Sequence, residues 1–146
     1  MYDIIKLLHL VAAVVWMGGM SFMLLALRPA AFEVLEGPVR ARLMGAVWRR
    51  FFGAVLVAIA VLLATGASLY AANAVAPTGW NLMLALGVTM MLIFGHIYLA
   101  GFRKFQRAVA AAQWPVTAQA ATLINRLVVV NFVLGWLAIG AVRLLH

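Results

Sequence analysis

Cysteine is absent from this chain of 146 residues, and acidic residues are scarce, with three Asp and Glu against 11 Lys and Arg. Without cysteine, disulfides, thiolate metal sites and a cysteine nucleophile are excluded. The acids, Asp3, Glu33 and Glu36, all lie outside the long apolar segments, which excludes a catalytic carboxylate pair within them. No nucleophile elbow or phosphate-binding loop occurs, so the residues themselves do not indicate an enzyme.

Charge of either sign is also sparse. Charged residues make up 10% of the chain and hydrophobic residues 68%, with a mean hydropathy of +1.12. Soluble proteins have about 25% charged and about 45–50% apolar residues. A chain of this length cannot bury so much apolar surface in water, so lipid must be its solvent. We expect residues 1–146 to form one transmembrane domain.

Four apolar runs are long enough to cross a bilayer, which takes roughly 20 residues. They are residues 4–27, 51–72, 80–102 and 123–145. Arg28-Pro29 is expected to end the first of them, because the residue before a proline disfavours the helical conformation. The predicted fold is all-α, an antiparallel bundle of four transmembrane helices with spans one and three parallel and on a diagonal.

Short interfacial helices are expected in the connections between spans. Leu35, Val39, Leu43 and Val47 recur at a four-residue spacing, which predicts an apolar stripe lying in the interface ahead of span two. Before span four, Thr117 is predicted to be the N-cap of a helix.

Basic residues are concentrated in two of the three connections. Arg28, Arg40, Arg42, Arg49 and Arg50 precede span two, and Arg103, Lys104 and Arg107 follow span three. The connection between residues 73 and 79 has no charge. The positive-inside rule places both basic connections in the cytoplasm and both termini in the periplasm of a bacterial inner membrane. The net charge of +8 is then expected to face anionic lipid headgroups rather than nucleic acid.

Placing a polar side chain inside a membrane span costs free energy, so the polar residues of the spans are candidates for function. With a helical rise of 1.5 Å per residue, His9 lies roughly 8 Å and His96 roughly 24 Å below the outer surface. Both are expected to face the bundle axis. Their offset of about 15 Å disfavours one haem held between them and favours two separate sites.

The same helical rise, applied to the other polar residues of the spans, predicts two layers of polar side chains at different depths in the membrane. The outer layer contains His9 and Thr65. The inner layer contains Met20, His96 and Asn131, with Arg28, Arg50 and Arg126 beneath it. A buried imidazole ligates a metal, serves as an axial haem ligand, relays a proton, or only hydrogen-bonds to the backbone. The thioethers of Met17 and Met20 suit Cu(I), but methionine is also a common filler of apolar cores.

Short motifs along nearly the whole chain resemble the copper-resistance D (CopD) family. They are Leu8-His9-Leu10, the Val15–Met20 segment, Arg50-Phe51-Phe52, Phe94-Gly95-His96 and Arg126-Leu127-Val128 with Asn131. The resemblance implies copper binding, transport or resistance in a bacterial inner membrane, with His9, His96, Met17 and Met20 as candidate ligands. Glycines and aromatic residues on the spans also suggest that copies of the chain associate in the membrane.

A second set of residues is similar to the haem-J-type protoporphyrinogen oxidases. Lys6, His9, Trp16 and Gly18 carry this likeness in span one, and Trp80, His96 and Arg103 carry it in span three. It implies a haem-dependent oxidoreductase with b-type haem on His9 or His96. The chain departs from that family's pattern because it lacks a lysine early in span three. A small scaffold without cofactor is the third reading.

Overall fold

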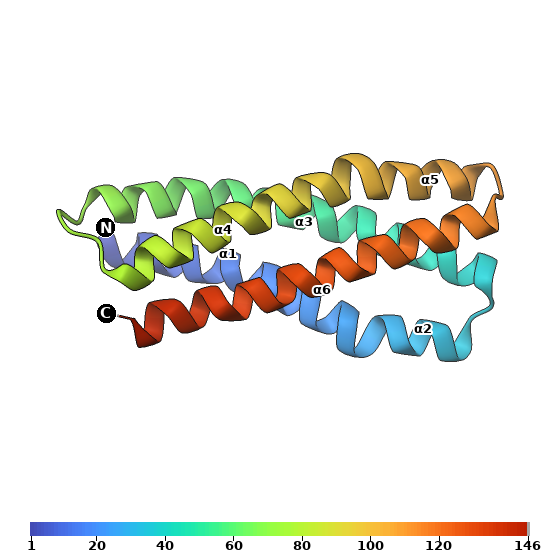
Figure 1. The fold of residues 1–146 in the computed structure, drawn as a ribbon, viewed down its shortest axis with the longest axis horizontal. Helices are drawn as coiled ribbons and strands as arrows, with labels where there is room; N and C mark the ends of the chain where they lie inside the picture. The colour runs from blue at the N-terminus through green and yellow to red at the C-terminus, as the bar shows by residue number, and fades with distance from the viewer. Residues whose placement is uncertain (146) are drawn as a thin grey trace.

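The computed structural model describes residues 1–145, and they form four long antiparallel helices (Figure 1). The first runs through α1 (Tyr2–Phe22), the π-helical segment η1 (Met23–Leu27) and α2 (Arg28–Val34). The second is α3 (Gly37–Ala71). The third runs through α4 (Thr78–His96), the π-helical η2 (Ile97–Phe102) and α5 (Arg103–Ala110), and the fourth is α6 (Trp114–Leu144). The predicted all-α bundle of four spans is confirmed.

Each of these helices is long and apolar enough to cross a membrane, with a mean hydropathy of 2.0 to 2.3 over its best window. The chain is therefore a multi-pass membrane protein. Helices of 31 to 35 residues are about 50 Å long, which exceeds the hydrocarbon thickness of about 30 Å. The ends of the bundle must project into the headgroup layers and beyond.

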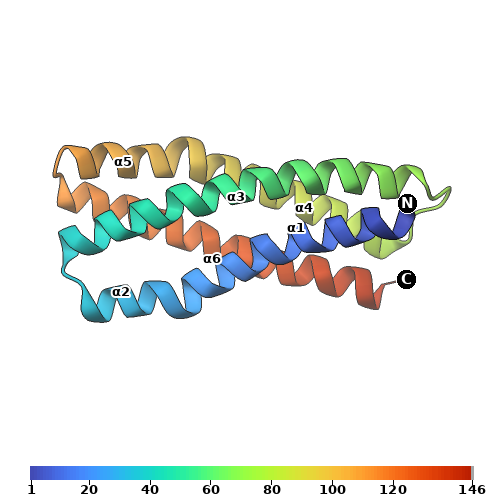
Figure 2. The ribbon, with the colours of Figure 1, turned by 180° about the vertical axis from the view of Figure 1, so that it is seen from behind.

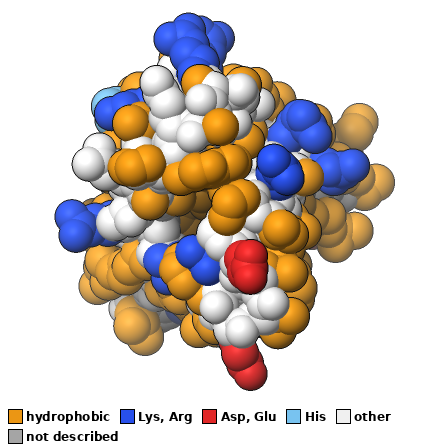
Figure 3. Space-filling view, turned by 90° about the vertical axis from the view of Figure 1, so that its right-hand side faces the viewer, with side chains coloured by type: hydrophobic (Ala, Val, Ile, Leu, Met, Phe, Trp, Pro, Cys, Tyr) orange, Lys and Arg blue, Asp and Glu red, His pale blue; other side chains and the backbone are white. Residues whose placement is uncertain are grey.

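The two ends of the bundle differ in charge. Both termini and the α3–α4 connection lie at one end, which we call the terminal end (Figures 1 and 2). The α2–α3 and α5–α6 connections lie at the other, and nine of the 11 Lys and Arg residues belong to this basic end. Figure 3 looks onto the basic end, where Lys and Arg side chains surround a surface with few acids.

The bundle is built from two helical hairpins. Helix α1 packs mainly on α3, and α4 packs mainly on α6. The parallel helices α1 and α4 meet across the centre of the bundle through side chains, where the ring of Trp16 lies edge-on to Phe94 at 6.2 Å. This is the arrangement expected of spans one and three on a diagonal.

Pro29 does not end the first helix, so that prediction is wrong. The helix continues to Val34 through the π-helical turn Met23–Leu27. A proline ring collides with the carbonyl four residues earlier and offers no N–H to it. The wider π turn relieves that collision at the carbonyl of Leu25, and the helix proceeds without a break.

The predicted interfacial helices are not separate elements. Residues 37–50 form the first turns of α3, and α5 continues span three, so both project along the bundle axis. The predicted stripe faces outward in part, because Met44 and Trp48 take the buried positions while Val39 and Leu43 are exposed. Thr117 is not an N-cap either: α6 begins at Trp114, and the Thr117 hydroxyl donates to the carbonyl of Gln113 at 3.0 Å.

At the terminal end, a backbone hydrogen bond of Gly79 joins the start of α4 to the end of α6. The N–H of Gly79 donates to the carbonyl of Leu145 at 2.9 Å. A Cβ at this position would collide with the carbonyl oxygens of Ala141 and Leu145. The absence of a side chain therefore lets the two backbones touch, as small residues do between membrane helices.

Candidate functional site

His9 and Thr65 form the outer polar layer that the helical rise predicts. The two side chains lie in α1 and α3, and His9 Nδ1 is 2.8 Å from Thr65 Oγ1. The Thr65 hydroxyl donates its own hydrogen to the carbonyl of Val61 at 2.6 Å. Thr65 must therefore accept from His9, which assigns the proton to Nδ1 and leaves the lone pair of Nε2 free. An imidazole oriented in this way is ready to ligate a metal through Nε2.

Replacing Thr65 by valine is expected to lower the free energy of unfolding by about 1 kcal/mol, because the Nδ1–H of His9 loses its acceptor. Thermal unfolding in detergent measures this change. Thr89→Val is the matched control, since the exposed Thr89 hydroxyl bonds only to Ala85 of its own helix. Equal effects of the two replacements would contradict the assigned role of Thr65.

Asn131 is the most deeply buried polar side chain of the bundle axis, with 1% of its surface exposed. Its Nδ2 donates to the carbonyl of Met90 in α4 at 3.1 Å. Its Oδ1 is buried and has no hydrogen-bond partner among residues 1–145. Rotating the amide by half a turn would place two oxygens against each other, so the orientation is fixed and Oδ1 stays without a donor.

Thioethers gather one turn away from Asn131. The sulfur of Met17, from α1, rests against the backbone of Gly135, which lies four residues after Asn131 on the same face of α6. The methyl group of Met90 comes within 3.3 Å of the place where a Cβ of Gly135 would stand. Met17 and Met90 thus meet at Gly135, and Asn131 lies one turn away and bonds to the backbone of Met90. We call Met17, Met90 and Asn131, which come from three helices, the axial cluster.

Met20 lies one turn further along α1 than Met17 and is 1% exposed. It shares the buried face of α1 with Trp16 and Met17. Met17 and Met20 therefore both lie inside the bundle, whereas their role as ligands stays a prediction.

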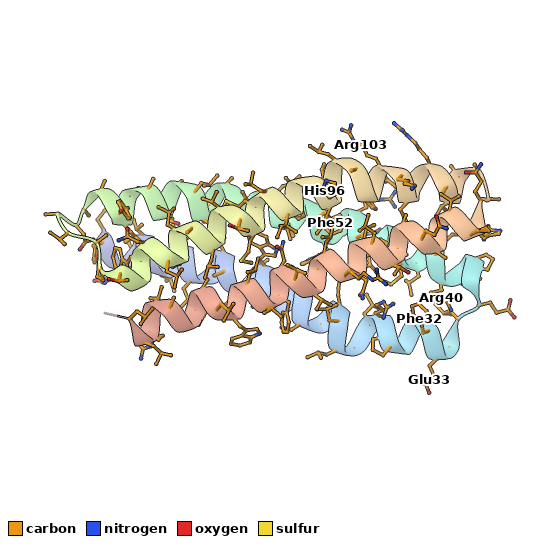
Figure 4. The ribbon with its side chains drawn as sticks, in the orientation of Figure 1. Phe32, Glu33, Arg40, Phe52, His96 and Arg103 are labelled. Carbon is orange, nitrogen blue, oxygen red and sulfur yellow. The ribbon has the colours of Figure 1, made fainter. Side chains whose placement is uncertain are left out.

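His96 does not face the bundle axis, so that prediction is wrong. Phe94 and Ile97 take the inward positions of this part of the helix, with 4% and 1% of their surfaces exposed. Because successive residues of a helix turn by about 100°, His96 is directed outward and is exposed. Figure 4 labels it on the same helix as Arg103, which follows two turns later.

The three arginines predicted beneath the inner layer lie on the surface of the basic end. Arg28 stacks on the ring of Phe32 at 4.7 Å, and Arg50 donates to the carbonyl of Ala46 at 3.0 Å. Arg126 lines a shallow cavity of about 380 Å³ on the outer face of α6. These residues therefore do not contribute to the axial cluster.

Sequence reasoning did not select Met90 and Gly135 as parts of the site. The spacing could have pointed to Gly135, because it follows the polar Asn131 by four residues and lies on the same face of the helix. The signal for Met90 is weaker, since it is one of three methionines in span three and only its buried position separates it from Met83 and Met91.

The donor set of the bundle is soft and nearly free of charge. Within residues 1–145, His, Asp and Glu do not form any group of three that would hold a metal ion. The donors present are thioethers, one oriented imidazole and one amide oxygen. Such a set suits Cu(I) and does not suit a hard divalent cation, which requires several carboxylate or carbonyl oxygens.

Comparison with known families gives one match. The profile of a family described as a domain of unknown function, DUF4149, matches residues 11–103, which is more than half of the chain. The chain belongs to this family. The DUF4149 match includes Met17, Met20, Thr65 and Met90, and it ends before Asn131 and Gly135. No curated protein and no solved structure is significantly similar to this DUF4149 chain.

Proposed function

We propose that this protein handles copper in a bacterial inner membrane, binding Cu(I) at the axial cluster. The observation that carries the proposal is the buried, unpartnered Oδ1 of Asn131, one helical turn from Gly135, where the side chains of Met17 and Met90 come together. Copper is here the cargo of the protein, with the methionine sulfurs as its donors. The resemblance to the CopD family supports the same reading.

The energetics of Asn131 support a bound cation. A buried polar atom without a partner costs about 1–3 kcal/mol, and native proteins keep few of them. The negative end of the amide dipole offsets part of the cost of placing a positive charge in a medium of low dielectric constant. Thioether sulfurs then provide the covalent part of the bonding, since they prefer Cu(I) over harder ions.

His9 is positioned to take part at the terminal end. It lies two turns before Met17 on α1, so about 12 Å of helix separates them. His9 and Met17 are therefore too far apart to bind the same ion. The separation suits a first binding site at His9, from which copper passes inward to the axial cluster. With the positive-inside rule, the basic end is cytoplasmic and the termini are periplasmic, which places His9 on the periplasmic side.

Binding is tested by titrating the purified, detergent-solubilised protein with Cu(I) against a colorimetric chelator. Met17→Leu keeps the side-chain volume and removes the sulfur, and we expect the affinity to fall about tenfold, equal to about 1.4 kcal/mol. Met83→Leu removes a sulfur of α4 outside the axial cluster and is expected to leave the affinity unchanged. Equal losses in both variants would contradict the proposal.

Gly135→Ala tests the position of the Met17 sulfur without removing it. The added methyl group would occupy the place of the sulfur, and the flexible Met17 side chain must move away. We expect weaker Cu(I) binding with little change in thermal stability. Gly140→Ala, in the same helix with open space at its Cβ position, is the control and should bind copper as the wild type does.

A haem-binding redox protein is the second candidate, and the free Nε2 of His9 favours it. The absorption spectrum of the purified protein separates the two readings. A Soret band that disappears in His9→Ala would replace the copper proposal with the haem one. Movement of copper across the membrane is a separate question, which a flux assay in sealed vesicles answers.

A further inference from the structure

A cavity of about 410 Å³ opens on the outside of the basic end, between the third helix and the start of α6. Arg103, Lys104 and Arg107 line it from α5, and Gln113 lines it from the α5–α6 turn. Its lining contains no acidic residue. A concave surface with three cations and no counter-charge attracts an anion strongly at the edge of a membrane.

The other walls of the cavity are apolar and continue toward the lipid. Leu99 and Ala100 precede the cations in η2, and Leu99 exposes 57% of its surface. His96 follows on the same edge of the helix, one to two turns closer to the membrane centre, and it is exposed (Figure 4). Charge at one end of the cavity and apolar surface at the other match the two parts of a phospholipid molecule.

The turn between α5 and α6 shapes the cavity. Ala112 adopts the left-handed conformation with φ 52°, which is unusual for a residue other than glycine. This lets the N–H of Gln113 reach back to the carbonyl of Ala108 at 2.9 Å. Gln113 is thereby held next to the cations of α5, and α6 begins directly against the cavity.

We propose that this cavity binds one anionic phospholipid, with the phosphate on Arg103, Lys104 and Arg107 and an acyl chain along Leu99 toward His96. The bound lipid would anchor the basic end, which projects from the hydrocarbon, to the membrane surface. The site is distinct from the axial cluster and does not depend on copper.

Native mass spectrometry of the detergent-solubilised protein tests this site. Phosphatidylglycerol is added as the probe, with zwitterionic phosphatidylcholine as the lipid control and inorganic phosphate as the competitor. In R103Q/K104Q/R107Q we expect the affinity for phosphatidylglycerol to fall on the order of 100-fold, since each cation near the membrane surface contributes about fivefold. R42Q/R49Q/R50Q removes the same charge from α3 at the same end and is expected to retain the lipid as the wild type does.

Three outcomes would overturn the proposal. Equal losses in the two triple variants would show attraction to the basic end as a whole. Equal retention of phosphatidylcholine would show that the headgroup charge is not recognised. Displacement of the lipid by inorganic phosphate would identify a phosphate site. If the first variant does not fold, K104Q/R107Q in the regular part of α5 provides the same comparison, and unchanged Cu(I) affinity in these variants separates the result from the copper proposal.

Discussion

Phe52→Ala is expected to lower the free energy of unfolding by about 3–5 kcal/mol, the largest loss of stability we predict for a single replacement. Phe52 is 1% exposed and lies where α3 meets the third helix (Figure 4). Its ring is edge-on to Phe94 at 5.6 Å and to Phe102 at 5.2 Å, and it stacks on Trp48 at 6.4 Å. Alanine would leave a cavity among these rings.

The physical reason is packing rather than the expulsion of water. Within a membrane, lipid tails are as apolar as the side chains, so helices associate through close contact and van der Waals attraction. Phe22→Ala is the matched control, because Phe22 exposes 61% of its surface toward the surroundings of the bundle. Thermal unfolding in detergent should show a large decrease for Phe52→Ala and a small one for Phe22→Ala. Similar decreases would contradict the role of the aromatic core.

The coarse fold follows from properties that act along one dimension. Runs of apolar residues set the number and length of the spans, and the basic connections distinguish the two ends. The rise of 1.5 Å per residue gives depth along the membrane normal, which is why His9 and Thr65 were predicted at one level and are hydrogen-bonded.

Rotation about the helix axis was less predictable. A span that is apolar on every side has no polar face to mark its outward side, so the sequence does not show which residues turn inward. His96 was expected at the axis because it is polar and because spans one and three lie on a diagonal, yet Phe94 and Ile97 fill the inward positions. The π turn that carries the first helix through Pro29 is equally invisible, because it depends on the packing of the whole span.

Parts of the axial cluster were predictable and parts were not. Asn131 stands out in the sequence as a polar residue within an apolar span, and Met17 and Met20 stand out by their spacing. Their meeting with Met90 depends on which two helices face α6 at that level, and this is decided by the pairing of the two hairpins. Sequence alone therefore identified candidate donors without showing which of them lie together.

Asn131→Leu is expected to change stability and copper binding in opposite directions. Leucine has the same branched shape and removes the buried Oδ1, whose lack of a partner costs about 1–3 kcal/mol in the metal-free protein. Removing Oδ1 therefore stabilises the metal-free protein, and the loss of the hydrogen bond to Met90 offsets part of this stabilisation. We expect the metal-free variant to unfold at a slightly higher temperature. Cu(I) affinity should fall at least about tenfold, since the amide dipole no longer faces the cation.

This pair of measurements distinguishes a binding residue from a packing residue. If Asn131 only packs, its replacement lowers the stability and leaves the Cu(I) affinity unchanged. If Asn131 binds copper, its replacement lowers the Cu(I) affinity and does not lower the stability, because functional residues often reduce the stability of a protein. Asn125→Leu is the control, because Asn125 is half-buried in the same helix and outside the axial cluster. Loss of stability in Asn131→Leu together with unchanged Cu(I) affinity would show that Asn131 only joins α6 to α4, and would remove it from the site.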